Sequence, residues 1–185
     1  MAVESAPLAW AGRYAPDMKI CIVSDSHDRA EPLDNAVRQA AAQGAAAVIH
    51  CGDLIGGHTV RPAMSAGLPI HLIHGNNLGD SFTLHRLARE SAGRLQYHGS
   101  EARLELGGRK IFVVHYPEYA YAMACTGDWD LVCCGHSHVA EIAQIPNVKG
   151  GKTWLVNAGT VAGLAAPATW VAGDLAAMHF EVRNL

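Results

Sequence analysis

The chain has 185 residues, of which 50% are hydrophobic and 17% charged, and its formal net charge is −3. The length suits one domain, and the composition excludes a disordered chain and argues against a broad nucleic-acid-binding surface. A small phosphate-containing substrate stays compatible with this charge, because bound metal ions supply positive charge that the sequence count omits.

The first segment, residues 1–17, lacks the basic start and the continuous apolar core of a signal peptide. We expect an N-terminal extension over 1–17 and a single domain over 18–185. The Ala-rich stretch 161–178 comes closest to a membrane helix, but Pro167 and Asp174 interrupt it, so no membrane partner is expected. The cysteine spacing shows no disulfide framework, which predicts a cytoplasmic location.

From Met18 onward, short apolar runs alternate with helical stretches, a pattern typical of βαβ units and a parallel sheet. The predicted elements of this first half, in chain order, are a strand over 19–24, a helix over 31–43, a strand over 46–50, a short helix over 58–66, a strand over 69–74 and a helix over 81–91.

For the second half of the chain, the sequence predicts strands. Two apolar runs, 102–106 and 110–115, flank Gly107-Gly108, which is a strong hairpin signal. We expect this half to be antiparallel and the first half to be parallel, giving an α/β (α+β) fold. The remaining predicted strands are 130–134, 139–145, 152–156, and a closing hairpin of 168–173 with 176–182.

Five of the predicted strands end at polar side chains that can bind a metal ion. Ligands of open α/β sheets bind beyond the carboxyl ends of the strands, so these side chains are expected to share one cleft. Residues two apart in extended chain point the same way, which would make the two pairs within this set converge. The residues are Asp25 with His27, Asp53, Asn76, His115, and His136 with His138.

The ligand chemistry of this set is mixed carboxylate, amide and imidazole, without thiolate. Such a set suits manganese, iron, zinc or nickel better than calcium, which prefers oxygen ligands. Seven side chains are too many for one ion of low coordination number, but they suit two ions that share a bridging carboxylate. We predict two divalent metal ions, with manganese favoured.

The order Asp-x-His, Gly-Asp, Gly-Asn, His and Gly-His-x-His resembles the calcineurin-like metallophosphoesterase family, in particular its compact, cap-less bacterial and archaeal phosphodiesterases. The resemblance covers roughly 18–185 and implies two packed mixed β-sheets flanked by helices, a four-layer αββα sandwich. It implies that a metal-bridging hydroxide hydrolyses a small phosphate ester, with a diester favoured over a monoester. It further implies one metal held by Asp25, His27 and His138, a second held by Asn76, His115 and His136, and Asp53 as the bridge.

Two positions depart from the family pattern. Relatives commonly follow Gly-Asn with His or Cys, whereas this chain has Asn77, which forms hydrogen bonds but cannot donate a proton as an acid. Relatives also often carry His-Gly-His where this chain has His115-Tyr116-Pro117. Our hypothesis is that esters with poor leaving groups turn over slowly. The side chains predicted to contact substrate are Asn76, Asn77 and Thr160.

Other readings stay open at this point. A retromer subunit of the same fold is a protein-interaction scaffold, and a two-metal hydrolase of amide or ester bonds would use similar ligands. The complete ligand set favours a phosphoesterase over a scaffold, while a homo-oligomer is neither indicated nor excluded. Asn157 and Thr160 either contact phosphate or form a tight turn with Gly159. Among the remaining histidines, we expect His50 and His71 to be packed, His74 to be packed or next to the site, and His58, His85, His98 and His179 to lie on the surface or on helices.

Overall fold

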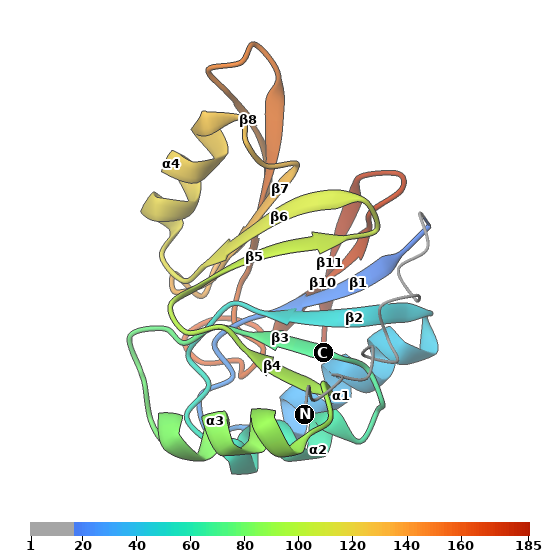
Figure 1. Cartoon of the computed structure of the whole chain (residues 1–185), viewed down its shortest axis with the longest axis vertical. Helices are drawn as coiled ribbons and strands as arrows, with labels where there is room; N and C mark the ends of the chain where they lie inside the picture. Colours follow the sequence, from blue (N-terminus) through green and yellow to red (C-terminus); the bar gives the residue numbers. More distant parts are fainter. Residues whose placement is uncertain (1–16) are drawn as a thin grey trace, which may run out of the picture.

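The computed structural model describes residues 17–185, so the predicted extension lies outside the described residues except for Asp17. Two β-sheets pack face to face, with three helices on the outer face of one sheet and one helix on the outer face of the other (Figure 1). This arrangement confirms the predicted four-layer αββα sandwich.

The first sheet contains six strands. Strands β1 to β4 lie side by side in this order and are parallel, with β4 at the edge of the sheet. Strands β10 and β11 extend it as an antiparallel hairpin beside β1. The carboxyl ends of β1, β2 and β3 therefore lie at one edge of the sheet. The spatial order is β11 (His179–Asn184), β10 (Thr169–Asp174), β1 (Lys19–Val23), β2 (Ala45–His50), β3 (Ile70–Leu72) and β4 (Leu95–Tyr97).

The second sheet contains five strands, and its three central members β6, β7 and β9 are parallel. Only the edge strands β5 and β8 are antiparallel to their neighbours. The prediction of an antiparallel second half is therefore wrong for the centre of this sheet. The spatial order is β5 (Glu101–Leu106), β6 (Arg109–Val114), β7 (Leu131–Cys134), β9 (Lys152–Ala158) and β8 (Ala140–Pro146).

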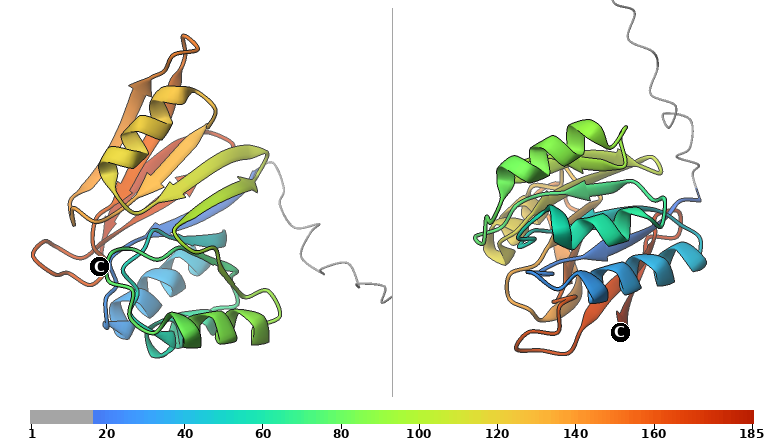
Figure 2. Two further views of the ribbon diagram at one scale, coloured as in Figure 1. Left: turned by 60° about the vertical axis from the view of Figure 1, so that its left-hand side comes forward. Right: turned by 90° about the horizontal axis from the view of Figure 1, so that it is seen from below.

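A helix that the sequence reading missed explains this topology. Helix α4 (Pro117–Thr126) connects β6 to β7, and parallel neighbours need such a crossover connection. It packs on the outer face of the second sheet. The outer face of the first sheet is covered by α1 (Ala30–Ala42), α2 (Gly57–Met64) and α3 (Ser81–Glu90), seen from below in Figure 2.

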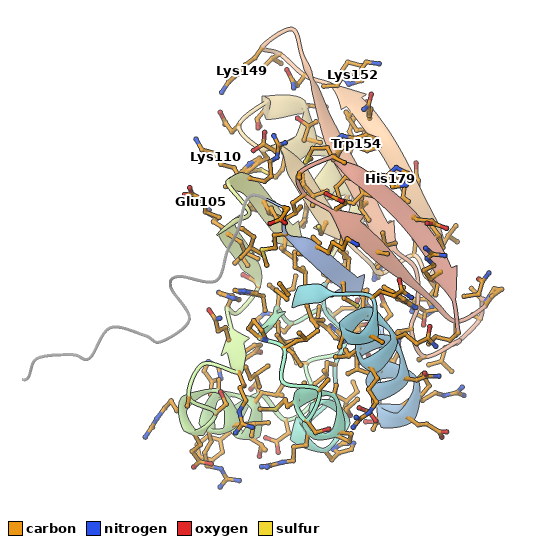
Figure 3. The ribbon with its side chains drawn as sticks, turned by 90° about the vertical axis from the view of Figure 1, so that its right-hand side faces the viewer. Glu105, Lys110, Lys149, Lys152, Trp154 and His179 are labelled. Atoms are coloured by element: carbon orange, nitrogen blue, oxygen red, sulfur yellow. The ribbon has the colours of Figure 1, made fainter. Side chains whose placement is uncertain are left out.

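The largest buried cluster fills the space between the sheets. Ile20, Ile22 and Ile49 of the first sheet meet Ile111 and Val156 of the second. At the end of this interface, Trp154 of β9 extends toward β11, and its ring meets Phe180 with centroids 5.3 Å apart (Figure 3). Burial of this apolar surface fixes the two sheets against each other, and with them the loops that follow their strands. No helix among residues 17–185 is long and apolar enough to span a membrane.

Candidate metal centre

The loops after five strands meet where the two sheets face each other. After β1 and β2 the backbones are tied directly, because Asp25 N donates to Gly52 O (3.0 Å) and His27 N donates to Asp53 O (2.8 Å). Across the sheets, His136 N donates to Asp25 Oδ2 (2.9 Å). All seven predicted ligand side chains belong to these loops, which follow β1, β2, β3, β6 and β7. The structure thus brings them together as the strand-end pattern predicted.

The reason for the convergence differs from the prediction. Five of the seven residues have left-handed backbone conformations, a region that side chains other than glycine rarely adopt. The prediction that extended backbone aligns Asp25 with His27, and His136 with His138, is therefore wrong. Backbone strain of this kind costs on the order of 1–3 kcal/mol per residue and gathers at functional sites. The φ values are 52° for Asp25, 46° for His27, 54° for Asp53, 68° for His136 and 60° for His138.

One group of candidate ligands consists of Asp25, His27 and His138, whose ligand atoms all lie within 4.8 Å of one another. Asp25 is fully buried, and its Oδ1 lies 3.2 Å from His138 Nε2. The Nε2 atoms of His27 and His138 are 3.4 Å apart. These three residues are the ones that the sequence analysis assigned to one metal ion.

A second group within the same limit consists of Asp25, Asp53 and His115. His115 Nε2 lies 3.4 Å from Asp53 Oδ1 and 3.0 Å from Asn76 Oδ1, and the same Asn76 oxygen lies 2.9 Å from His136 Nδ1. Asn76, His115 and His136, assigned together from the sequence, are therefore neighbours. Asp25 belongs to both groups, so the two sets of ligand atoms adjoin.

Backbone carbonyls fix the protonation of two of these histidines. His115 Nδ1 donates to Cys51 O (2.8 Å), and His138 Nδ1 donates to Leu164 O (2.8 Å). A carbonyl oxygen can only accept, so in the neutral rings the proton lies on Nδ1 and the lone pair on Nε2. Both lone pairs point into the site, the arrangement that metal-ligating histidines use.

The resulting cluster of acceptors fits a cation. In the neutral rings, His115 Nε2 faces Asn76 Oδ1 at 3.0 Å and His138 Nε2 faces Asp25 Oδ1 at 3.2 Å, so two acceptor atoms meet in each place. Asp25 Oδ1 is buried and has no hydrogen-bond partner, although buried carboxylate oxygens normally have one. A positive ion would satisfy all these atoms at once, so the residues present fit divalent metal ions.

Asn77 holds Asp53 in place. Its backbone N–H donates to Asp53 Oδ1 (2.9 Å), and its side-chain amide donates to Asp53 Oδ2. Burial raises the pKa of Asp53, but these two hydrogen bonds, with His115 and His27 adding to them, outweigh burial and lower the pKa below its ordinary value. The carboxylate is therefore ready to bind a cation near neutral pH.

Two glycines are required by close approach. A Cβ on Gly75 would lie 2.7 Å from His115 Nε2 and would collide with Asp53 Oδ1. A Cβ on Gly135 would collide with Ser24 Oγ and Asp25 Oδ2. At both positions the missing side chain makes room for the ligands.

The end of β9 and the turn that follows it hold two of the loops of the site in place. Thr160 is fully buried and its hydroxyl donates to Asp25 O (3.0 Å), a placement that favours support over the predicted contact with substrate. Asn157 Nδ2 donates to Gly135 O (2.9 Å) and to Ser137 Oγ (3.0 Å), which holds the loop that carries His136. Asn76 and Asn77, by contrast, are exposed at the site.

The remaining histidines follow the expectations. His50 is fully buried and shares a hydrogen bond with Ser26 Oγ (2.9 Å), and His71 is buried against His98. His74 is half-buried next to the site and contacts the Tyr97 hydroxyl (3.0 Å). The contact of His50, at the end of β2, with Ser26, in the loop after β1, was not predicted, because nothing in the sequence pairs these two residues. The other four, His58, His85, His98 and His179, are exposed.

Known proteins are similar to this chain in sequence and in fold. A phosphodiesterase of Methanocaldococcus jannaschii is 26% identical over 133 residues, which cover 71% of this chain and 80% of that protein. A solved archaeal phosphodiesterase has a TM-score of 0.81 at 23% identity, covering 91% of this chain and 100% of that chain. The Vps29 protein of Entamoeba histolytica has a TM-score of 0.59 at 14% identity, covering 91% of this chain and 99% of that chain.

At these identities the two solved structures show that the fold is shared. The family assignment comes from a family model, which is described as a calcineurin-like phosphoesterase superfamily domain and matches residues 18–178. That range contains every loop of the candidate metal centre. The chain therefore belongs to the calcineurin-like phosphoesterase superfamily.

Proposed function

We propose that this protein is a two-metal-dependent phosphodiesterase that hydrolyses small phosphate esters. The observation that carries the proposal is the convergence of ligand atoms from the loops after β1, β2, β6 and β7 in two adjoining groups that share Asp25. The phosphodiesterase of Methanocaldococcus jannaschii, which is similar over most of its length, supports the same reaction class.

For the division of the seven residues between two ions, we propose the one that the resemblance implies. Asp25, His27 and His138 would hold one ion, and Asn76, His115 and His136 would hold the other, with Asp53 between them. Bound divalent ions supply a water of lowered pKa and neutralise phosphate charge. The mixed nitrogen and oxygen ligands favour manganese, with iron, zinc or nickel as alternatives.

The chain itself positions and orients these groups. The Cys51 and Leu164 carbonyls accept from Nδ1 of His115 and His138 and so direct their Nε2 atoms toward the site, and Asn77 holds the Asp53 carboxylate and lowers its pKa. The exposed Asn76 and Asn77 place amide groups where a phosphate oxygen can be bound. Because these residues are open to solvent, the site accepts a phosphate with two ester groups, which favours diesters over monoesters.

The test is hydrolysis of bis-(p-nitrophenyl) phosphate and p-nitrophenyl phosphate by metal-stripped protein, with Mn²⁺, Ni²⁺, Zn²⁺ or Mg²⁺ added back separately. We expect activity only with metal, a higher rate on the diester, and about two bound ions per chain by elemental analysis. Asp53→Ala should abolish turnover, while Asp128→Ala, which removes an exposed carboxylate paired with Lys149, should leave it intact.

A failure would have a clear meaning. Two bound ions without turnover of either ester would favour the interaction-scaffold alternative. An absence of bound metal would overturn the metal centre itself. Equal loss of activity in Asp53→Ala and Asp128→Ala would point to a defect in folding and not in the site.

A further inference from the structure

A pocket of about 280 Å³ lies directly beside the candidate metal centre. Gly75 and His115 form its wall on the side of the metal centre, and Tyr116 and Tyr119 form its wall on the side of α4; we refer to it as the tyrosine pocket. A phosphate bound at the metal centre would therefore have one of its ester groups within reach of this pocket. Its volume is near the lower end for ligand pockets, roughly 300–1,000 Å³, which suits a single small group.

Aromatic rings continue without a break from the metal ligands into the tyrosine pocket. The Tyr116 ring centroid lies 4.8 Å from that of His136 and 5.3 Å from that of His115. The Tyr119 ring follows, with its centroid 5.6 Å from that of Tyr116 and an interplanar angle of 72°. Edge-to-face packing of this kind leaves ring surface free for a further aromatic group.

The start of α4 creates this arrangement. Tyr116 is the N-cap residue and Pro117 the first helical residue, so the helix begins directly after the His115 strand end. Tyr119 lies in the first turn of the helix, and it lines the same pocket as Tyr116. Where relatives often carry His-Gly-His, this chain has the first tyrosine and the helix-starting proline.

Core packing does not account for Tyr119, because 59% of it is exposed, whereas Ala120 and Ala124 form the buried face of the helix. Exposure alone would not mark a site, since Tyr121 on the same helix is 55% exposed and lies outside the pocket. The position of Tyr119 in the wall of the tyrosine pocket, which is also lined by the candidate ligand His115, distinguishes the two.

The opposite rim is polar. Ser100 and Glu101 line the pocket at the start of β5, and Glu101 Oε1 accepts hydrogen bonds from Arg103. A ring in the pocket would have the tyrosines against its apolar surface and these side chains near its edge. This combination fits a planar ring with polar substituents.

We propose that the tyrosine pocket binds an aromatic ring carried by one ester group of the phosphodiester substrate, and that Tyr119 determines this specificity. The proposal rests on the proposed phosphodiesterase function and names the substrate class for it. An aryl group and a nucleobase share the required chemistry, so the test compares both.

The experiment is calorimetric titration of the Mn²⁺-loaded protein with three diesters: dimethyl phosphate, methyl phenyl phosphate and thymidine 5′-methyl phosphate. None carries a nitrophenyl group, which could itself enter the pocket. We expect a ring-bearing diester to bind about tenfold more tightly than dimethyl phosphate, within the range for one ring stacked on an aromatic side chain. Whether the phenyl or the thymidine ester benefits more identifies the source of the ring.

The variants give the decisive comparison. Tyr119→Ala should reduce the affinity ratio of ring-bearing diester to dimethyl phosphate to about one, and Tyr119→Phe should restore it because the ring is kept. Tyr121→Ala is the matched control from the same helix and should leave the ratio unchanged. All four proteins are also assayed on bis-(p-nitrophenyl) phosphate, which reports the proposed function separately.

A metal-dependent diesterase in which the ring gives no gain in affinity, or in which Tyr119→Ala keeps the gain, would overturn the pocket assignment and leave the proposed function standing. A protein that binds metal but hydrolyses no diester would fail the proposed function instead. An equal loss of the ratio in Tyr119→Ala and Tyr121→Ala would also count against the pocket.

Discussion

At the scale of single residues, Asn77 has two consequences for the reaction. It holds Asp53 with two hydrogen bonds, and it occupies the position where relatives commonly carry a histidine. An amide cannot protonate a leaving alcohol, so departure of the leaving group depends on that group's own acidity.

We therefore predict that rates fall steeply as the leaving group becomes more basic. Along a series of aryl methyl phosphodiesters, Asn77→His should make the plot of log kcat against leaving-group pKa shallower and raise the rate on the most basic leaving group. General acid catalysis typically accelerates a reaction by about 10²–10⁴-fold. For a histidine that has not been optimised, we expect a smaller gain, about tenfold, in kcat on the most basic leaving group. The measurement is kcat for each ester under chemistry-limited conditions.

Asn77→Ala is the control, because it loses the side-chain hydrogen bond to Asp53 and keeps the backbone one without gaining an acid, and it should lower all rates without changing the slope. Equal rates of the unmodified protein on alkyl and nitrophenyl diesters would contradict the hypothesis.

At the scale of elements, the loop after β3 is packed against the loops after β2 and β6 with no spare room. Gly75 is where they touch, since a Cβ there would meet His115 and Asp53. We predict that Gly75→Ala displaces both side chains and lowers metal affinity and diester turnover by about tenfold or more, as small displacements of positioned groups do. Metal content and kcat are the measurements.

The control is Gly151→Ala, because a Cβ at Gly151 meets only Asn147 atoms at 3.7 Å and beyond, ordinary contact distances. That variant should retain metal and activity. If Gly75→Ala behaves in the same way, the loops are looser than their packing indicates.

Element prediction succeeded where the local signal was strong. The buried runs of β1, β2 and β6 and the Gly107-Gly108 hairpin were identified close to their observed bounds. Strand β4 was missed because Gln96 interrupts its apolar residues, whereas the equally short β3 lies within a longer apolar run. Helix α4 was missed although Pro117 and Gly127 mark its ends, because its apolar residues are not confined to one face.

The same division holds for the site. The ligand positions could be read from strand ends, since parallel strands place their carboxyl ends at one edge. The support given by Asn157 and Thr160, and the contact of His50 with Ser26, join residues far apart in sequence through packing. Neither a spacing nor a turn type encodes such contacts, so only the folded chain shows them.

At the scale of the whole molecule, folding buries histidines that must stay neutral. Burial lowers the pKa of His50 to about 3, with His115 adding to the effect, and burial together with His98 lowers the pKa of His71 to about 4. In the unfolded chain both would titrate near 6.5. Their stabilisation is therefore complete above pH 6.5 and is lost as the pH falls toward 4 and then 3, because the unfolded state binds the protons first.

We predict that the free energy of unfolding of the metal-free protein decreases between pH 6.5 and 4.5, with each of these histidines contributing at most about 1.4 kcal/mol per pH unit. His71→Gln should reduce proton uptake on acid unfolding by about one, because the amide does not titrate. Urea unfolding across this pH range in the presence of a chelator measures the slope without a contribution from metal release. The exposed His179 supplies the control: His179→Gln should keep the original slope, and an equal slope in His71→Gln would show that burial of His71 does not govern acid stability.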